Sequence, residues 1–226
     1  MIKPRTLLLH GVLILFALII LAPVVYTFLT SLKLFRDIIS GSWSFDPTLR
    51  NYEQLFMSNR NNFVDLTRNS LIVGVLTLVV VIVVAALGAY SLSRFKWRRA
   101  ISGLVMGWLL FVNMLPPIIF VGPYYLIARN LEIYDTAIAI VMAHSILNLP
   151  LAFWMLHSFF ADVPIELEEA ASIDGCSRLQ TFLRIVLPIA RPGIAATAVL
   201  VFVFSWKEFL FALTLSSTPA AMTIPV

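Results

Sequence analysis

The sequence predicts an all-α integral membrane protein. Of its 226 residues, 60% are apolar and 12% are charged, and the mean hydropathy is strongly positive. These proportions leave too little polar surface for a soluble globule. Several apolar runs are also long enough to cross about 30 Å of hydrocarbon as helices. The net charge of +4 is modest and its basic residues lie beside apolar runs, so it indicates membrane topology rather than nucleic-acid binding.

Five apolar runs predict five membrane-spanning helices within one transmembrane domain, residues 1–226. The third run contains Pro116-Pro117 and the fourth contains Pro150, so we expect both helices to be kinked or locally unwound. Distorted helices often line a pathway, although packed membrane helices also simply tolerate prolines. The expected spans are 7–32, 71–92, 101–127, 136–160 and 193–215.

The fifth run is the shortest, because only about 15 residues separate Arg191 from Lys207. We therefore expect the helix to begin at Gly193 and to continue through Lys207 and Glu208 to Leu215. An ionisable residue inside the membrane is a functional candidate. Adjacent helix residues do not face each other, so these two side chains should meet different partners. The alternative is that one or both reach back to the membrane interface.

The short loops predict the orientation. Residues 94–99 carry four basic side chains and no acid, which places this loop in the cytoplasm. Lys3 and Arg5 place the amino terminus on the same side, so 33–68 lies outside and 162–192 returns to the cytoplasm. The first apolar run is longer than a signal-peptide core and no small-x-small cleavage site follows it, so we expect an uncleaved first helix.

The polar segment 162–192 predicts a helix-turn-helix. Pro164 suits the first turn of a helix, and the acidic residues Glu166, Glu168 and Glu169 favour the positive end of its dipole. Asp174-Gly175 is a turn signal, and Gly175 suits the left-handed residue that ends a helix.

A second helix is predicted to begin at Ser177, where Ser177 and Gln180 have the spacing of a capping box. Leu187-Pro188 is expected to end this helix. One apolar stripe follows the helical period, at Leu179, Phe182, Leu183 and Val186. A capped, amphipathic helix pair between two membrane spans indicates a docking element, and the alternative is a connector that lies on the membrane interface.

The segment from Glu169 to Pro192 resembles the signature loop of permease subunits in binding-protein-dependent ABC importers. The matching features are a Glu-Ala-Ala triplet, an Asp-Gly turn, a Phe in the second helix and a Leu-Pro pair. They are present here as Glu169, Ala170, Ala171, Asp174, Gly175, Phe182, Leu187 and Pro188. Weaker similarity extends along nearly the whole chain and resembles the maltose-type branch of sugar permeases, at 30–33, 69–71, 89–95, 115–117, 149–154 and 205–209.

This resemblance implies a type I ABC importer helix bundle with a cytoplasmic coupling helix-turn-helix. The chain would be a multi-pass permease of the bacterial inner membrane that imports a sugar or related solute. Its partners would be two ATPase subunits, a second permease subunit and an extracytoplasmic solute-binding protein. ATP and magnesium would bind to the ATPase, with no cofactor on this chain. The eight signature residues would transmit closure of the nucleotide sites to the membrane helices.

The resemblance also indicates a solute pathway. Its candidate residues are Ser205, Trp206, Lys207, Glu208, Pro116 and Asn148. Permeases of this branch commonly carry Asn where this chain has Lys207. Because Lys only donates hydrogen bonds, Lys207 would either favour an anionic or acidic sugar or pair with a carboxylate of the partner subunit.

Two features of the sequence bear on functions other than transport by an ABC importer, namely catalysis and self-contained transport. Glu166 and Glu169 have the spacing of paired carboxylates, but no catalytic motif, phosphate loop or metal-ligand spacing accompanies them, so we expect neither an enzyme nor a metal site. The single cysteine, Cys176, excludes an internal disulfide. A self-contained ion- or proton-coupled carrier is the runner-up, with Lys207, Glu208 and Asp135 as its relay.

The chain ends at Val226, just after the fifth expected span, whereas relatives usually have a sixth. Either the protein is shorter than its relatives, or the sequence is a fragment that lacks the last helix.

Overall fold

The computed structural model describes residues 4–57 and 62–226, where every regular element is a helix. Lys3, which entered the orientation argument, lies outside the described residues. Contacts divide the chain into an amino-terminal unit, residues 1–63, and a bundle unit, residues 64–226.

The amino-terminal unit contains the first expected span as helix α1, Pro4–Ser31. Two short helices follow, α2 at Phe35–Ile39 and α3 at Arg50–Met57. The loop between them folds around Lys33, whose Nζ donates to the Ser42 carbonyl at 2.7 Å and lies 4.8 Å from the centre of the Phe45 ring. This loop therefore has an internal cationic centre.

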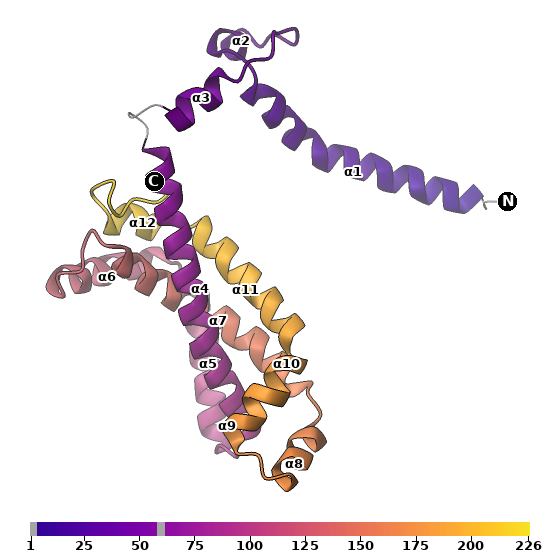
Figure 1. Cartoon of the computed structure of the whole chain (residues 1–226), viewed down its shortest axis with the longest axis vertical. Helices are drawn as coiled ribbons and strands as arrows, with labels where there is room; N and C mark the ends of the chain where they lie inside the picture. Colours follow the sequence, from indigo (N-terminus) through magenta and orange to yellow (C-terminus); the bar gives the residue numbers. More distant parts are fainter. Residues whose placement is uncertain (1–3, 58–61) are drawn as a thin grey trace. The chain divides into compact units, whose positions relative to one another are not determined.

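The bundle unit is built on three long helices, α4 at Phe63–Arg94, α7 at Ala137–Ala161 and α11 at Arg191–Trp206 (Figure 1). Its core packs α7 against α11 and α4, with aromatic rings seated on glycines. A Cβ added at Gly193 would overlap the Phe159 ring, and one at Gly88 would lie 2.8 Å from a Phe153 ring atom. Small residues thus let the helices approach closely, as is usual in membrane bundles.

The third expected span is broken at its two prolines, which confirms the predicted distortion. Helix α5, Arg99–Met114, and helix α6, Ile118–Asn130, meet at an angle of 99°. By contrast, α7 continues through Pro150 without interruption, so the local unwinding considered for the fourth span does not occur.

The expectation of one helix through 193–215 is wrong. Helix α11 ends at Trp206 and a separate helix, α12, begins at Leu210 and ends at Leu215. The charged pair Lys207-Glu208 therefore lies in a break between two helices. The physical reason is that the Glu208 carboxylate accepts hydrogen bonds from the backbone N–H groups of Phe211 and Ala212, and so caps α12 instead of continuing α11.

The segment 162–192 forms the predicted helix-turn-helix, with α8 at Ile165–Ile173 and a second helix made of α9 at Arg178–Thr181, a π-helical turn η1 at Phe182–Val186 and α10 at Leu187–Ile189. The predicted end at Leu187-Pro188 is confirmed to within one residue, because the second helix ends at Ile189 and the chain bends by 77° before α11. Pro188 lacks an N–H and its ring crowds the carbonyl four residues earlier, so the preceding turn widens into a π-helix and the chain continues.

At the end of the bundle unit opposite α8 and α9, the loop after α12 (Figure 1) is held by two polar side chains. Asp135, in the turn before α7, accepts hydrogen bonds from the backbone N–H of Ser217 at 2.8 Å and from the Thr218 hydroxyl at 2.7 Å. Asn69 on α4 donates to the carbonyls of Pro219 and Met222, both at 3.0 Å. These bonds order the loop after α12.

Candidate functional site

The turn between α8 and α9 has the local geometry that its sequence predicts. Gly175 has a φ of +82°, the left-handed conformation that glycine adopts without steric cost. The Ser177 hydroxyl accepts from the Gln180 backbone at 3.3 Å, and the Gln180 side chain accepts from the Ser177 backbone at 2.8 Å. Both halves of the capping box are present, so the second helix is stabilised at its first residue.

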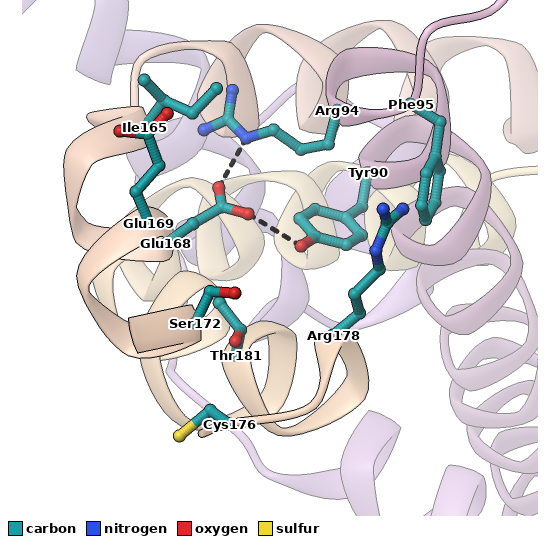
Figure 2. Close-up of a pocket in the computed structure, with 10 residues that line it drawn as sticks. All are labelled: Tyr90, Arg94, Phe95, Ile165, Glu168, Glu169, Ser172, Cys176, Arg178 and Thr181. Carbon is teal, nitrogen blue, oxygen red and sulfur yellow. Dashed lines mark hydrogen bonds and ion pairs between the residues drawn. The ribbon is translucent and has the colours of Figure 1, made fainter. Parts of the chain in front are cut away.

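Glu168 joins this helix pair to the end of α4. Its carboxylate accepts from the Tyr90 hydroxyl at 2.8 Å and pairs with the Arg94 guanidinium, both on α4 (Figure 2). The Glu168 and Arg94 side chains are each only 12% exposed. Arg94 also donates to the carbonyls of Phe160 and Val163 at 2.8 and 2.6 Å, where α7 ends. One guanidinium thus holds together α4, α7 and α8.

Aromatic packing reinforces this connection. The Phe182 ring is 4% exposed and lies 4.6 Å from the centre of the Tyr90 ring and 6.0 Å from that of Phe160. Val186 is fully buried beside them. Leu179 and Leu183, the other members of the predicted stripe, are exposed. The stripe therefore divides into a buried half that anchors the loop to this chain and an exposed half.

The structure separates the eight signature residues by accessibility. Ala171 and Phe182 are buried within the chain, and Leu187 and Pro188 are partly buried, so their first role is to hold the loop against the bundle. Ile173, just before the turn, is an exposed apolar side chain at 86% of its full surface. The accessible signature residues are Glu169, Ala170, Asp174 and Gly175.

A second candidate site is a cleft of about 740 Å³ in the bundle unit. It lies where both helix breaks, α5/α6 and α11/α12, meet the middle of α7. Broken helices expose backbone groups that a membrane tolerates beside a water-filled cavity. The lining residues include Asn113, Pro116, Asn148, Phe204, Lys207 and Glu208. Four of the six predicted pathway residues therefore line one cavity, namely Pro116, Asn148, Lys207 and Glu208.

The carboxylate of Glu208 is held in place from two directions. It accepts from the backbone N–H groups of Phe211 at 3.1 Å and Ala212 at 3.3 Å, which are unpaired donors in the first turn of α12. His144 on α7 lies 2.9 Å away through its Nε2 and bonds to the Ser205 hydroxyl at 2.8 Å through its Nδ1. The other two predicted pathway residues are not among those that line the cleft. Ser205 is buried, and the Trp206 ring lies 5.6 Å from the Phe202 ring.

Sequence reasoning missed the partners that fix both sites. The sequence predicted for Glu168 only a favourable charge near a helix amino terminus, and it predicted no role for His144. The spacing of Tyr90 and Arg94 by one helical turn was a usable signal, since it places both side chains on one face of α4. His144 offered no local signal, because Ser205 and Glu208 are 61 and 64 residues away.

Comparison with known proteins agrees with this geometry. Residues 82–226 match the family described as the inner membrane component of binding-protein-dependent transport systems. The trehalose transport system permease protein SugB of Mycobacterium tuberculosis is 34% identical over 207 residues, which cover 91% of this chain and 74% of that protein. The sulfoquinovosyl glycerol transport system permease protein SmoH of Agrobacterium fabrum is 34% identical over 211 residues, 91% of this chain and 72% of that protein.

Among solved structures, a bacterial ABC transporter involved in the import of the acidic polysaccharide alginate superposes with a TM-score of 0.78. The match covers 97% of this chain and 76% of the other, at 23% sequence identity. This similarity shows that the two chains share a fold.

A helix bundle with a cleft between broken helices and a capped helix pair agrees with the class of membrane transport subunits. The chain belongs to the family of binding-protein-dependent transport system inner membrane components, the permease subunits of ABC importers, in the branch that contains sugar permeases. The comparisons give no support to the self-contained carrier.

Proposed function

We propose that this chain forms half of the path by which a sugar-like solute crosses the bacterial inner membrane, with its amino terminus in the cytoplasm. Its relatives' names, trehalose and sulfoquinovosyl glycerol permeases, support a sugar-like solute. The observation that carries the proposal is the cleft between two broken helices, because transporters bind solutes where helices are interrupted near the middle of the membrane.

The partners follow from this role. A solute-binding protein delivers the solute, a second permease subunit closes the path, and two ATPase subunits bind the ATP and magnesium. In this proposal ATP hydrolysis belongs to the ATPase subunits, and this chain needs neither catalytic residues nor a cofactor of its own. The accessible face of α8 and the turn at Gly175 contact the ATPase, and the exposed Leu179 and Leu183 extend that surface.

Helix α7 connects the two sites. Asn148 lines the cleft, and Ala161 ends α7 next to α8 of the coupling helices, by which we mean α8 to α10. The two residues are 13 positions apart, or about 20 Å along the helix. Movement of α8 by the ATPase is transmitted through Arg94, which binds both Glu168 and the carbonyls at the end of α7. Rigid-body motion of packed helices is an ordinary way to convert such a displacement into opening or closure.

The test is purification of the tagged chain from its native membrane in mild detergent, with subunit stoichiometry measured by mass spectrometry. Wild type should retain two ATPase subunits and one second permease. Gly175→Arg should lose the ATPase or its solute-stimulated activity while still inserting in the membrane, because arginine is strained at a φ of +82°. Gly175→Asn is the matched control, since asparagine tolerates this conformation. A wild-type chain that retains no ATPase, even after cross-linking, would overturn the proposal.

A further inference from the structure

Lys207 places a positive charge in the cleft. It follows the last residue of α11, its side chain is exposed, and its Nζ lies 4.4 Å from the centre of the Phe204 ring, which also lines the cleft. Stacking on this ring orients the ammonium group without neutralising it. A lysine held beside a cavity by an aromatic ring is positioned to bind a ligand.

The neighbouring carboxylate does not neutralise this lysine. Glu208 is the only acidic side chain among the described residues that line the cleft, and its oxygens accept from His144, Phe211 and Ala212. Within 4–57 and 62–226, none of the ion pairs includes Lys207. His144 and the first turn of α12 thus hold the Glu208 carboxylate and leave Lys207 without an anionic partner among the residues that the structure describes.

The rest of the lining suits a sugar. Asn148 donates its amide N–H to the His144 carbonyl at 2.8 Å, so its amide oxygen can accept from a hydroxyl. Asn113 contributes an exposed amide, and Phe204 and Phe209 contribute rings. Aromatic faces with a few polar groups are usual in sites that bind small polar ligands.

We propose that the cleft selects an anionic sugar, whose acid group binds Lys207 while its hydroxyls bind the two asparagine amides. This inference rests on the proposed function and names the solute class of the same cleft. The competing role for Lys207 is an ion pair with a carboxylate of the second permease subunit. That ion pair would stabilise the assembly of the two subunits and would not make transport selective for charged solutes.

The experiment uses the complete importer in proteoliposomes. Its probes are matched sugars in neutral and uronic-acid form, glucose with glucuronate and a glucose disaccharide with its uronic-acid counterpart. The affinity of the solute-binding protein for each probe is measured separately by calorimetry, so that differences in uptake at saturating binding protein report the permease step. The variants are Lys207→Asn, Lys207→Arg and, as control, Arg129→Gln, which removes another cation that lies over an aromatic ring but outside the cleft.

We expect Lys207→Asn to lower the uptake ratio of acid to neutral sugar by roughly ten-fold or more, the size of one charge-assisted hydrogen bond. Lys207→Arg should retain most of the ratio, and Arg129→Gln should retain all of it.

Two results would overturn the inference of an anionic sugar and leave the proposed transport function standing. One is a ratio unchanged by Lys207→Asn. The other is an equal loss of both series with loss of the second permease from the purified complex, which would assign Lys207 to the subunit interface. Transport of neither series by wild type would overturn the proposed sugar function and this inference with it.

Discussion

Glu168 shows how one side chain decides the position of a whole segment. It binds two residues one turn apart on α4, and its Arg94 partner holds the end of α7 as well. A charge that is mostly removed from water is stabilising only while its partner remains, so loss of either group leaves the other uncompensated. The position of α8 relative to α4 and α7 therefore depends on the Glu168 contacts, in addition to the packing of Phe182.

We predict that Glu168→Gln loosens α8 and impairs coupling. The amide keeps the size of the side chain but not its charge, so Arg94 is left partly buried without a counter-ion, at a cost of up to about 3 kcal/mol. Hydrogen exchange measured by mass spectrometry should become faster across residues 165–186. ATP hydrolysis by the complex should no longer be stimulated by solute.

The matched control is Glu166→Gln, which changes an exposed carboxylate on the same helix. Exchange that is equally fast in both variants, or unchanged in Glu168→Gln, would show that the Glu168 contact does not fix the helix pair.

At the scale of helices, packing is set by glycines that face rings. Gly193 on α11 meets the Phe159 ring so closely that a methyl group would overlap it, whereas, apart from the adjacent backbone of α5 itself, no described residue lies within 4 Å of a methyl group placed at Gly107 on α5. The same substitution should therefore have opposite effects at the two positions.

We expect Gly193→Ala to destabilise the purified complex by about 1–3 kcal/mol, because the Phe159 ring must move away from α11. Gly107→Ala should be neutral or stabilising by up to about 1 kcal/mol, since alanine favours a helix. Thermal unfolding in detergent, followed by light scattering and intrinsic fluorescence, measures both. A wild-type midpoint for Gly193→Ala would contradict the tight α7–α11 contact.

The helices also show what a sequence can and cannot predict. The capping box at Ser177 and the left-handed Gly175 are local signals, so both were correct. The break at Lys207-Glu208 was missed because hydropathy counts charges but does not show that a carboxylate can cap a new helix. Similarly, the apolar period through Phe182 and Val186 predicted a face correctly, but periodicity does not say whether that face meets a partner or the chain's own core.

At the scale of the whole molecule, contacts between distant segments determine both sites. The cleft residues were individually predictable from their motifs, but their convergence on the middle of α7 depends on two helix breaks that lie about 90 residues apart. The same holds at the far end of the bundle unit, where Asp135 binds residues 82 and 83 positions later.

The Asp135 contact predicts a pH dependence of stability. Burial would raise its pKa, but the donors of Ser217 and Thr218 outweigh that effect and hold the pKa below the ordinary value of 3.8. Its contribution to stability is therefore complete above that value and is lost as the pH falls through the lower folded-state pKa. Asp135→Asn should lower the unfolding midpoint at pH 7 by a few °C, about 1 kcal/mol for a largely solvated group.

The difference between wild type and Asp135→Asn should shrink in strongly acidic buffer, where the wild-type carboxyl is protonated. Asn preserves the φ of +60° at this position, so backbone strain does not enter the comparison. Thermal melts of both proteins at several pH values measure the effect, and a midpoint difference that is the same at neutral and acidic pH would exclude the carboxylate as its source.

The capped turn and the buried Phe182 have a consequence for the kinetics of assembly. Because α8 and α9 are already ordered against the bundle, an ATPase that docks on them as proposed would not have to fold a loose segment, and little conformational entropy would be lost on association. Association should then be limited by the encounter rate and orientation of the two subunits rather than by a slow ordering step. Little of the free energy of ATP hydrolysis would then be needed to order the contact between the two subunits again in each cycle.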